Sequence, residues 1–332
     1  MNPLTTMPQT FFRTKDAMNP PLAQDIMVTK LVTLLPDTEV AEAIRLLVKH
    51  SISGAPVTEA DSNYLGVFSE KCCMKLFDVI ARFAKQQQVA LPTLPDARQI
   101  MSTKLVTLSP DTDVVQAIGD LLDHRISGAP VVDSDGQFLG VFSEKTSMSV
   151  LVQAAYEQLP STEVAAFMDT DLERTILEDV SFLECARMFR ETPYRRLPVL
   201  RDGKLVGLIS RRDVLRNSNE LASMISGGKV TLRATSDSRS AVGVTHPIVF
   251  DRVRHFLDLE AETITEDRDL LAIAKEFLHT PYRRFPVIRD GKLIGQVSRR
   301  NVLMATHRLM KITPQREVSP LYLSALNAAF HH

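Results

Sequence analysis

Four arginine doublets occur in the second half of the chain, and their side chains are suited to binding phosphate. A guanidinium group holds a phosphate through two parallel hydrogen bonds, and a helix N-terminus adds free N–H groups and partial positive charge. The alternative is that the doublets form a solvated basic surface without a ligand, because arginine doublets also occur in surface turns. The doublets are Arg195-Arg196, Arg211-Arg212, Arg283-Arg284 and Arg299-Arg300.

Two serines in the same region are each followed, three residues later, by a side chain with an acceptor oxygen. They are Ser210 with Asp213, and Ser298 with Asn301. A carboxylate or amide oxygen can accept hydrogen bonds from ligand hydroxyl groups. The Ser-x-x-Asp spacing is also that of a helix capping box. We favour the ligand role, and both roles can hold together.

These residues belong to a pattern that occurs four times in strict register. A threonine lies 23 residues before a Pro-Val pair, a glycine follows nine or ten residues after the proline, and a serine follows three residues after the glycine. A fixed repeat determines the architecture, and therefore the places where a ligand can bind. The threonines are Thr33, Thr107, Thr175 and Thr263; the prolines are Pro56, Pro130, Pro198 and Pro286; the serines are Ser69, Ser143, Ser210 and Ser298.

Each repeat predicts a β-α-β-β-α unit. A short β-branched run holds the threonine, and an apolar stripe at i, i+3, i+4, i+7 then indicates a helix, as at Val40, Ala43, Ile44 and Leu47. The Pro-Val strand and the glycine-containing strand form a hairpin, with Asp-Gly turns in three repeats. The closing serine is placed as the N-cap of a second helix.

The repeat resembles the CBS domain, the small nucleotide-sensing repeat named after cystathionine β-synthase. The resemblance rests on the threonine, the Pro-Val strand, the glycine and the terminal Ser-x-x-Asp/Asn, and it covers nearly the whole chain. It implies an α+β fold in which repeats pair about a pseudo-twofold axis, with a cleft between their sheets. Four repeats then form two such modules in a disc, as in the γ subunit of AMP-activated protein kinase, although no motif specific to that subunit occurs.

The resemblance also implies an adenosine nucleotide (AMP, ADP or ATP) as the ligand. In the CBS family, an aspartate three residues after the serine often binds the ribose hydroxyls. Asp213 keeps this acid and Asn301 keeps an acceptor, whereas Cys72 and Thr146 take the position in repeats 1 and 2. The predicted ligand-binding residues are Thr175, Arg195, Arg196, Pro198, Ser210, Arg211, Arg212, Asp213, Thr263, Arg283, Arg284, Pro286, Ser298, Arg299, Arg300 and Asn301.

Similarity between the repeats predicts that neighbours in the sequence pair as 1+2 and 3+4. Repeats 1 and 2 share Ile-Ser-Gly-Ala-Pro-Val, and they carry Glu70-Lys71 and Glu144-Lys145 where repeats 3 and 4 carry arginine doublets. Repeats 3 and 4 share Thr-Pro-Tyr-Arg-Arg, whose Tyr194 and Tyr282 either stack on a base or pack against the sheet.

The predicted domain limits follow from this pairing. They are an N-terminal extension at 1–20, a first pair at 21–160 with repeats at about 21–80 and 95–155, a second pair at 161–310 with repeats at about 164–218 and 250–308 and a loop-rich insert at about 219–248, and a tail at 311–332.

Composition indicates which cellular compartment and which binding partners to expect. The net charge of −1 divides into 13 Lys/Arg and 18 Asp/Glu over residues 1–160, against 26 and 22 over residues 161–332. We expect a cytoplasmic protein, because there is no signal core, no apolar run near the roughly 20 residues of a membrane span, and no metal or disulfide spacing among the three cysteines. Sparse aromatic residues speak against nucleic-acid binding.

Two function classes remain after an enzyme is set aside. No nucleophile–base pair, P-loop or paired carboxylate set occurs, so we expect a protein without catalytic residues and with no required cofactor. The first class is a regulatory protein that senses an adenosine nucleotide in module 3+4 and signals to a separate effector protein. The alternative is a ligand-free structural or oligomerisation scaffold built of repeats. We expect a homo-oligomer in either case.

Overall fold

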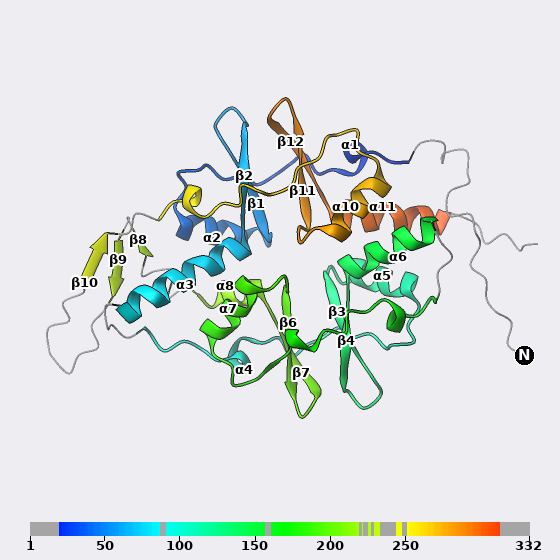
Figure 1. Ribbon diagram of the computed structural model, residues 1–332, viewed down its shortest axis with the longest axis horizontal. Helices are drawn as coiled ribbons and strands as arrows, with labels where there is room; N and C mark the ends of the chain where they lie inside the picture. The colour runs from blue at the N-terminus through cyan, green and yellow to red at the C-terminus, as the bar shows by residue number, and fades with distance from the viewer. Residues whose placement is uncertain are drawn as a thin grey trace, which may run out of the picture.

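The computed structural model describes residues 20–86, 91–156, 161–218, 221, 225–226, 229–232, 244–247 and 251–312. Four related units, each with a helix, an antiparallel hairpin and a second helix, account for most of them (Figure 1). Repeats 1 and 2 contain α2 (Val40–Lys49), β1 (Gly54–Thr58), β2 (Tyr64–Ser69), α3 (Glu70–Gln86), α5 (Val114–Asp123), β3 (Gly128–Val132), β4 (Phe138–Ser143) and α6 (Glu144–Tyr156).

Repeats 3 and 4 have the same order of elements, and a short helical turn or pair of turns precedes every repeat. These turns are α1 (Ala23–Ile26), α4 (Ala97–Ile100), the 3-10 turns η2 (Val164–Ala166) and η3 (Leu172–Arg174), and η4 (Val253–His255). Repeats 3 and 4 contain β5 (Ile176–Leu177), α7 (Phe182–Glu191), β6 (Arg196–Arg201), β7 (Lys204–Ser210), α8 (Arg211–Arg216), α10 (Leu270–His279), β11 (Arg284–Arg289), β12 (Lys292–Ser298) and α11 (Arg299–Ile312). The predicted α+β fold of four repeats is confirmed.

The apolar stripes form the buried faces of the first helices. In α2 the buried residues are Val40, Ala43, Ile44 and Leu47, and α5, α7 and α10 bury the corresponding four positions. Burial of the larger of these side chains, such as Ile44 and Leu47, stabilises each by roughly 1.5–3 kcal/mol relative to exposure. The threonine-bearing run is shorter than predicted: it forms β5 in repeat 3 and a single parallel bridge in each other repeat.

The Asp-Gly turns of repeats 3 and 4 have the tight hairpin geometry that their sequences predict, whereas in repeat 2 only Gly136 of the Asp135-Gly136 pair has a positive φ, of 79°. Asp202 and Gly203 adopt φ of 52° and 78°, and Asp290 and Gly291 adopt 50° and 76°. Two consecutive positive φ angles define the type I′ turn, whose twist matches that of the flanking strands.

The segment that precedes each repeat hydrogen-bonds to the hairpin of another repeat, and the two repeats involved exchange these segments reciprocally. Before repeat 2, Ser102 N donates to Leu208 O in β7 of repeat 3 at 3.0 Å; before repeat 3, Asp169 N donates to Val141 O in β4 of repeat 2 at 2.9 Å. Repeats 1 and 4 exchange their segments in the same way. There Val28 N donates to Gln296 O at 2.9 Å, and Asp258 N donates to Val67 O at 2.8 Å.

The repeated glycines lie where these exchanged segments cross the hairpins. A Cβ added to Gly140 would lie 2.7 Å from Asp169 O, and one added to Gly66 would lie 2.6 Å from Asp258 O. Both contacts are shorter than a side-chain carbon tolerates against backbone. The glycine of the sequence motif is therefore required by the crossing segment rather than by a ligand.

The modules are accordingly 1+4 and 2+3, which corrects the predicted pairing of 1 with 2 and 3 with 4. The hairpins of each module also meet edge to edge: Tyr64 N donates to Gly291 O at 3.0 Å, and Phe138 N to Gly203 O at 3.2 Å. Similarity between repeats misled the prediction because each module contains one repeat of each type. Similar repeats therefore occupy equivalent places in different modules and do not pair with each other.

The helices join the two modules through two apolar cores. One core unites repeats 1 and 3 and contains Phe77 and Phe182, whose rings meet edge to face with centroids 5.9 Å apart. The other unites repeats 2 and 4 and contains Phe142 and Phe277. The four repeats thus form a flat ring with hairpins at top and bottom and helices at either side (Figure 1).

The insert between repeats 3 and 4 contains strands where its composition predicted loop. β8 (Ile225–Ser226), β9 (Lys229–Leu232) and β10 (Val244–Pro247) form one antiparallel sheet in the order β10-β9-β8. Figure 1 shows this sheet at one end of the ring, outside the four repeats. Short runs such as Lys229–Leu232 form strands by pairing with each other, a tertiary effect that composition does not report.

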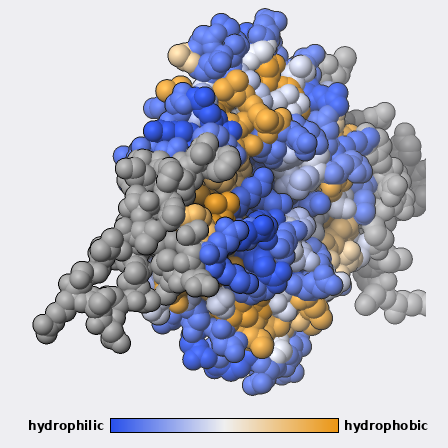
Figure 2. Space-filling model, turned by 60° about the vertical axis from the view of Figure 1, so that its left-hand side comes forward, coloured by the Kyte–Doolittle hydropathy of each residue, from blue (hydrophilic) through white to orange (hydrophobic). Residues whose placement is uncertain are grey.

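The surface on the side of that sheet is mostly hydrophilic, and its hydrophobic patches are separated by hydrophilic stretches (Figure 2). No helix among the described residues is both long and apolar enough to cross a bilayer.

Candidate functional site

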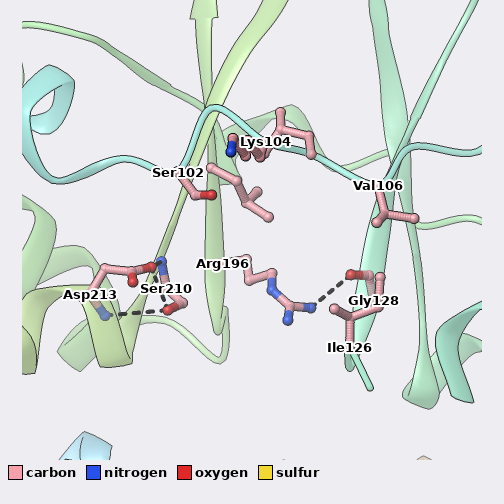
Figure 3. A pocket seen from close by; sticks show the side chains of 10 residues that line it. Ser102, Lys104, Val106, Ile126, Gly128, Arg196, Ser210 and Asp213 are labelled. Carbon is pink, nitrogen blue, oxygen red and sulfur yellow. Dashed lines mark hydrogen bonds between the residues drawn. The ribbon is translucent and has the colours of Figure 1, made fainter. Parts of the chain in front are cut away.

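A pocket lies inside module 2+3, between the hairpins of its two repeats (Figure 3). One wall is formed by β6 and β7 of repeat 3 and the other by the start of β3 of repeat 2. The exchanged segment 102–106 crosses above both. The lining residues are Ser102, Lys104, Leu105, Val106, Ile126, Gly128, Arg196, Leu208, Ser210 and Asp213.

Asp213 combines the two roles that the sequence left open. Its Oδ2 accepts hydrogen bonds from Ser210 N at 2.8 Å and from Ser210 Oγ at 2.6 Å, while Ser210 Oγ accepts from Asp213 N at 3.3 Å. This is a capping box at the N-terminus of α8. The nearest ionic partner of the other oxygen, Oδ1, is Arg216 at 3.9 Å. One carboxylate oxygen is therefore available toward the pocket that Asp213 lines.

Arg196 spans the pocket from one repeat to the other (Figure 3). It belongs to β6, and its Nη1 donates to Gly128 O in repeat 2 at 2.7 Å. Burial, followed by the nearby charge of Arg283, lowers the pKa of Arg196 to about 10. The group stays a cation at neutral pH. Lys104, on the exchanged segment, adds a second, exposed cation.

Module 1+4 repeats the arrangement with different side chains. Arg284 Nη1 donates to Gly54 O at 3.2 Å, as Arg196 does to Gly128 O. Asn301 replaces Asp213, and its Oδ1 accepts from Ser298 N at 2.9 Å. The amide keeps the cap but has no negative charge.

Arg211 and Arg299, which were predicted to bind phosphate, contact helix-end carbonyls in the structure. Arg211 is 4% exposed, and its Nη2 donates to Phe189 O and Thr192 O at the C-terminal end of α7, at 3.1 and 3.2 Å. Arg299 does the same for α10, at 2.9 Å to both Phe277 O and Thr280 O. Burial lowers the pKa of each to about 10. These two guanidinium groups satisfy helix-end carbonyls.

Arg212 and Arg300 connect the two modules. Arg212 Nη2 donates to Ser51 O in repeat 1 at 2.8 Å, and its Nε lies 3.4 Å from Glu70 Oε1. Arg300 donates to Leu122 O in repeat 2. Both arginines therefore hold repeats together across the helix-packed interfaces.

Arg195 and Arg283 lie at the centre of the ring. Arg283 pairs with the buried Glu144 of repeat 2, with Nη2 and Oε2 2.6 Å apart. Arg195 donates to Pro281 O at 3.4 Å and has no carboxylate partner among the described residues. Desolvation, together with the charges of Arg283, Arg211 and Arg299, lowers the pKa of Arg195 well below its usual range.

The other predicted residues contribute to the fold more directly than to the pocket. Pro198 and Pro286 are buried in β6 and β11, paired with Leu208 and Gln296. Thr175 Oγ1 donates to Leu172 O at 2.8 Å, and Thr263 is exposed.

Of the sixteen predicted residues, the pocket in module 2+3 brings together Arg196, Ser210 and Asp213. The pocket residues that sequence reasoning missed come from repeat 2 and the segment before it. Ile126 and Gly128 belong to the Ile-Ser-Gly motif, which was used only as a sign of similarity between repeats. Their position opposite repeat 3 depends on the exchange of segments, for which the repeat motif gave no signal.

The model of the CBS domain matches the chain four times, at residues 23–79, 97–146, 164–220 and 253–308. The chain belongs to the CBS domain family. Each match falls on one of the four structural repeats and begins at the short turn that precedes it.

Individual relatives are distant. The uncharacterized protein MJ1225 of Methanocaldococcus jannaschii is 24% identical over 197 residues, which are 56% of this chain and 68% of that protein. Its crystal structure matches with 20% identity and a TM-score of 0.37, covering 85% of this chain and 99% of that one. The crystal structure of CBSX2 in complex with AMP matches with 26% identity and a TM-score of 0.33, covering 38% and 97%.

Proposed function

We propose that this CBS protein is a regulatory sensor that binds an adenosine nucleotide in the pocket of module 2+3. The observation that carries the proposal is the Asp213 carboxylate, which lines a mixed polar and apolar pocket with one oxygen held by its helix cap and the other free of a close partner. Such an oxygen can accept hydrogen bonds from the two adjacent hydroxyl groups of a ribose.

The remaining lining residues suit the other parts of a nucleotide. Val106, Ile126 and Leu208 offer apolar surface for a base, and Lys104 and Arg196 offer positive charge for phosphate. Ser102 and Ser210 add hydroxyl groups. The earlier expectation of a ligand between repeats 3 and 4 is replaced by one between repeats 2 and 3.

The origin of the walls supports a regulatory role. The pocket is lined by β3 of repeat 2, β6 and β7 of repeat 3 and the exchanged segment 102–106. A ligand in this pocket contacts both repeats and the exchanged segment. It stabilises one relative position of these parts by the difference between its affinities for that position and for the alternatives. Arg196 also belongs to the charged centre, because Arg283 and Glu144 act on it. A separate effector protein would detect the change; its identity stays open.

The ligand-free scaffold is favoured by a separate observation. Arg211, Arg299, Arg212 and Arg300 direct their guanidinium groups at backbone carbonyls, and two of these contacts cross between repeats. A purely structural ring needs such contacts and needs no ligand.

Titration of the purified full-length protein decides between the two functions. Mass spectrometry of the denatured preparation identifies any adenylate carried through purification, and calorimetric titration with adenosine, AMP, ADP, ATP and S-adenosylmethionine then ranks the ligands. The sensor predicts saturable binding of at least one adenosine nucleotide, with affinity that increases on going from adenosine to AMP. Absence of binding by all five at millimolar concentration would leave the scaffold.

A further inference from the structure

The two hairpins of module 2+3 are crossed in the same way, each by the segment that precedes the other repeat, so the pocket has an equivalent position on the opposite hairpin, here called the second cleft. The first cleft is crossed by Ser102, which bridges to Leu208; the second is crossed by Asp169, which bridges to Val141. When repeats 2 and 3 are aligned on their threonines and prolines, each residue that lines the first cleft has an equivalent in the second. Arg174, just before Thr175, takes the place of Val106, and Tyr194, four residues before Pro198, takes the place of Ile126.

Arg174 and Tyr194, the two residues that replace Val106 and Ile126, contact each other. The Arg174 guanidinium carbon lies 4.9 Å from the centroid of the Tyr194 ring, and Arg174 Nη2 forms an ion pair with Asp169. The Tyr194 hydroxyl donates to Asp171. Arg174 is only 9% exposed. In the first cleft the corresponding residues, Val106 and Ile126, both line the pocket.

The backbone before repeat 3 is built to make this contact. The two exchanged segments differ in length between the residue that forms the bridge and the threonine of the following repeat. The segment that leads into repeat 3 takes six residues, from Asp169 to Thr175, whereas the segment that leads into repeat 2 takes five, from Ser102 to Thr107. The extra residue is accommodated in the 3-10 turn η3, whose N-cap Asp171 accepts from Glu173 N at 2.9 Å. The turn ends at Arg174 itself.

The ribose position of the second cleft is also altered. Thr146 takes the place of Asp213, and its hydroxyl is used locally: Oγ1 accepts from Ser143 N at 2.7 Å and donates to Ser143 O at 2.9 Å. A hydroxyl that already donates and accepts in the helix cap is a poor partner for two ribose donors.

Module 1+4 shows that the contact is not a general property of the fold. Its residue before the threonine is Glu262, an anion that cannot form a cation–π contact with Tyr282, and the Tyr282 hydroxyl donates instead to Glu260 O at 3.2 Å. The arginine, the extra residue and the η3 turn occur together before repeat 3.

We infer that Arg174 closes the second cleft of module 2+3 by occupying the face of Tyr194 on which a base would stack, so that this module takes one adenosine nucleotide and not two. The inference rests on the proposed function, since it concerns which cleft of the same module receives the nucleotide. A ligand can enter only if Arg174 leaves both Tyr194 and Asp169.

The test converts the closed cleft to the composition of the open one in the full-length protein. Arg174→Val copies Val106, and Thr146→Asp copies Asp213. Calorimetric titration with AMP is compared among wild type, Arg174→Val, and the double variant. Arg187→Val is the matched control because Arg187 is an exposed arginine on α7. The double variant should bind one more AMP per chain than wild type, and the control should match wild type.

Further arms separate the possible failures. Adding Asp213→Ala to the double variant should remove the original site and keep the new one, so that one AMP is lost and one remains. A folded double variant with unchanged stoichiometry would overturn the role of Arg174 while leaving the proposed function intact. Wild type that binds no AMP would overturn both. Arg174→Gln, which removes the charge but keeps the length, replaces Arg174→Val if thermal unfolding shows that the valine variant does not fold, and the same extra AMP is then required.

Discussion

Asp213 is the residue at which the proposed function can be tested most sharply, because its two carboxylate oxygens have separate tasks. Oδ2 accepts two hydrogen bonds within the cap of α8, and Oδ1 has Arg216 at 3.9 Å as its nearest ionic partner. Asp213→Ala removes both oxygens. We expect a loss of about 1 kcal/mol in the free energy of unfolding, within the roughly 0.5–2 kcal/mol typical of a lost N-cap.

The effect of the same change on ligand binding should be larger. A hydrogen bond to a charged group contributes about 1.5–3 kcal/mol, which corresponds to a decrease of roughly 10- to 150-fold in AMP affinity. Asp213→Asn separates the two effects. Repeat 4 shows that asparagine maintains the cap, since Asn301 Oδ1 accepts from Ser298 N at 2.9 Å. The asparagine variant should therefore unfold like wild type and bind AMP with an affinity between those of wild type and the alanine variant.

The assay is calorimetric titration with AMP and 2′-deoxy-AMP, alongside chemical unfolding of the same preparations. Wild type should prefer AMP over the deoxy form, and Asp213→Ala should lose that preference. Unchanged AMP affinity in a folded Asp213→Ala variant would show that Asp213 is a helix cap alone, and the ribose assignment would be refuted.

Three further predictions concern the stability of the fold. Arg211→Ala leaves two helix-end carbonyls without their donor, so urea unfolding should show a loss of about 2–4 kcal/mol while AMP affinity changes less than twofold; a large affinity loss at unchanged stability would restore the phosphate role. Tyr64→Phe should raise the free energy of unfolding at pH 7 by up to about 1 kcal/mol, because the Tyr64 hydroxyl is buried without a hydrogen-bond partner among the described residues. Burial raises the pKa of Tyr64, and the nearby Asp258 and Tyr282 raise it further. The stability that depends on the neutral phenol is therefore present below pH 10 and is lost as the pH rises above it. Tyr64→Phe should flatten this decline when the free energy of unfolding is measured from pH 8 to 11. Gly140→Ala places a Cβ 2.7 Å from Asp169 O and should lower the melting temperature far more than Gly119→Ala in α5, where the nearest atom to an added Cβ is His307 Nε2 at 3.4 Å. Equal effects of the two substitutions would contradict the close crossing.

Local structure could be predicted from the sequence because its signals lie within a few residues of each other. The stripe at Phe182, Cys185, Ala186 and Phe189 predicted the buried face of α7, and Ser210 predicted the N-cap of α8. The capping box and the ligand position at Asp213 were likewise visible in one tetrapeptide. These features depend on helix periodicity and on backbone N–H groups that need an acceptor, so they do not require knowledge of the partner repeat.

The pairing of the repeats could not be predicted in this way, and the roles of the arginines depended on it. Arg212 meets Ser51 O, which lies 161 residues earlier in the chain, and Arg283 meets Glu144, which lies 139 residues earlier. A guanidinium group binds phosphate, carboxylate and backbone carbonyl with similar geometry. The residue type therefore indicated what kind of group Arg211 or Arg212 would bind, and only the fold decided that this group is part of the protein.

The two repeat types are complementary in charge, and this complementarity joins the two modules to each other. Repeats 1 and 2 carry Glu-Lys at the start of their second helix, and repeats 3 and 4 carry arginine doublets. Every ion pair described at the centre joins the two types: Glu70 with Arg212, and Glu144 with Arg283. Both ion pairs cross between the modules, since Glu70 of repeat 1 meets Arg212 of repeat 3 and Glu144 of repeat 2 meets Arg283 of repeat 4. Buried guanidinium groups without counter-charges are costly, so the packing of unlike repeats across the helix interfaces places each of these glutamates beside an arginine. Arg195 has no carboxylate partner among the described residues and is left as the cation whose charge is least compensated.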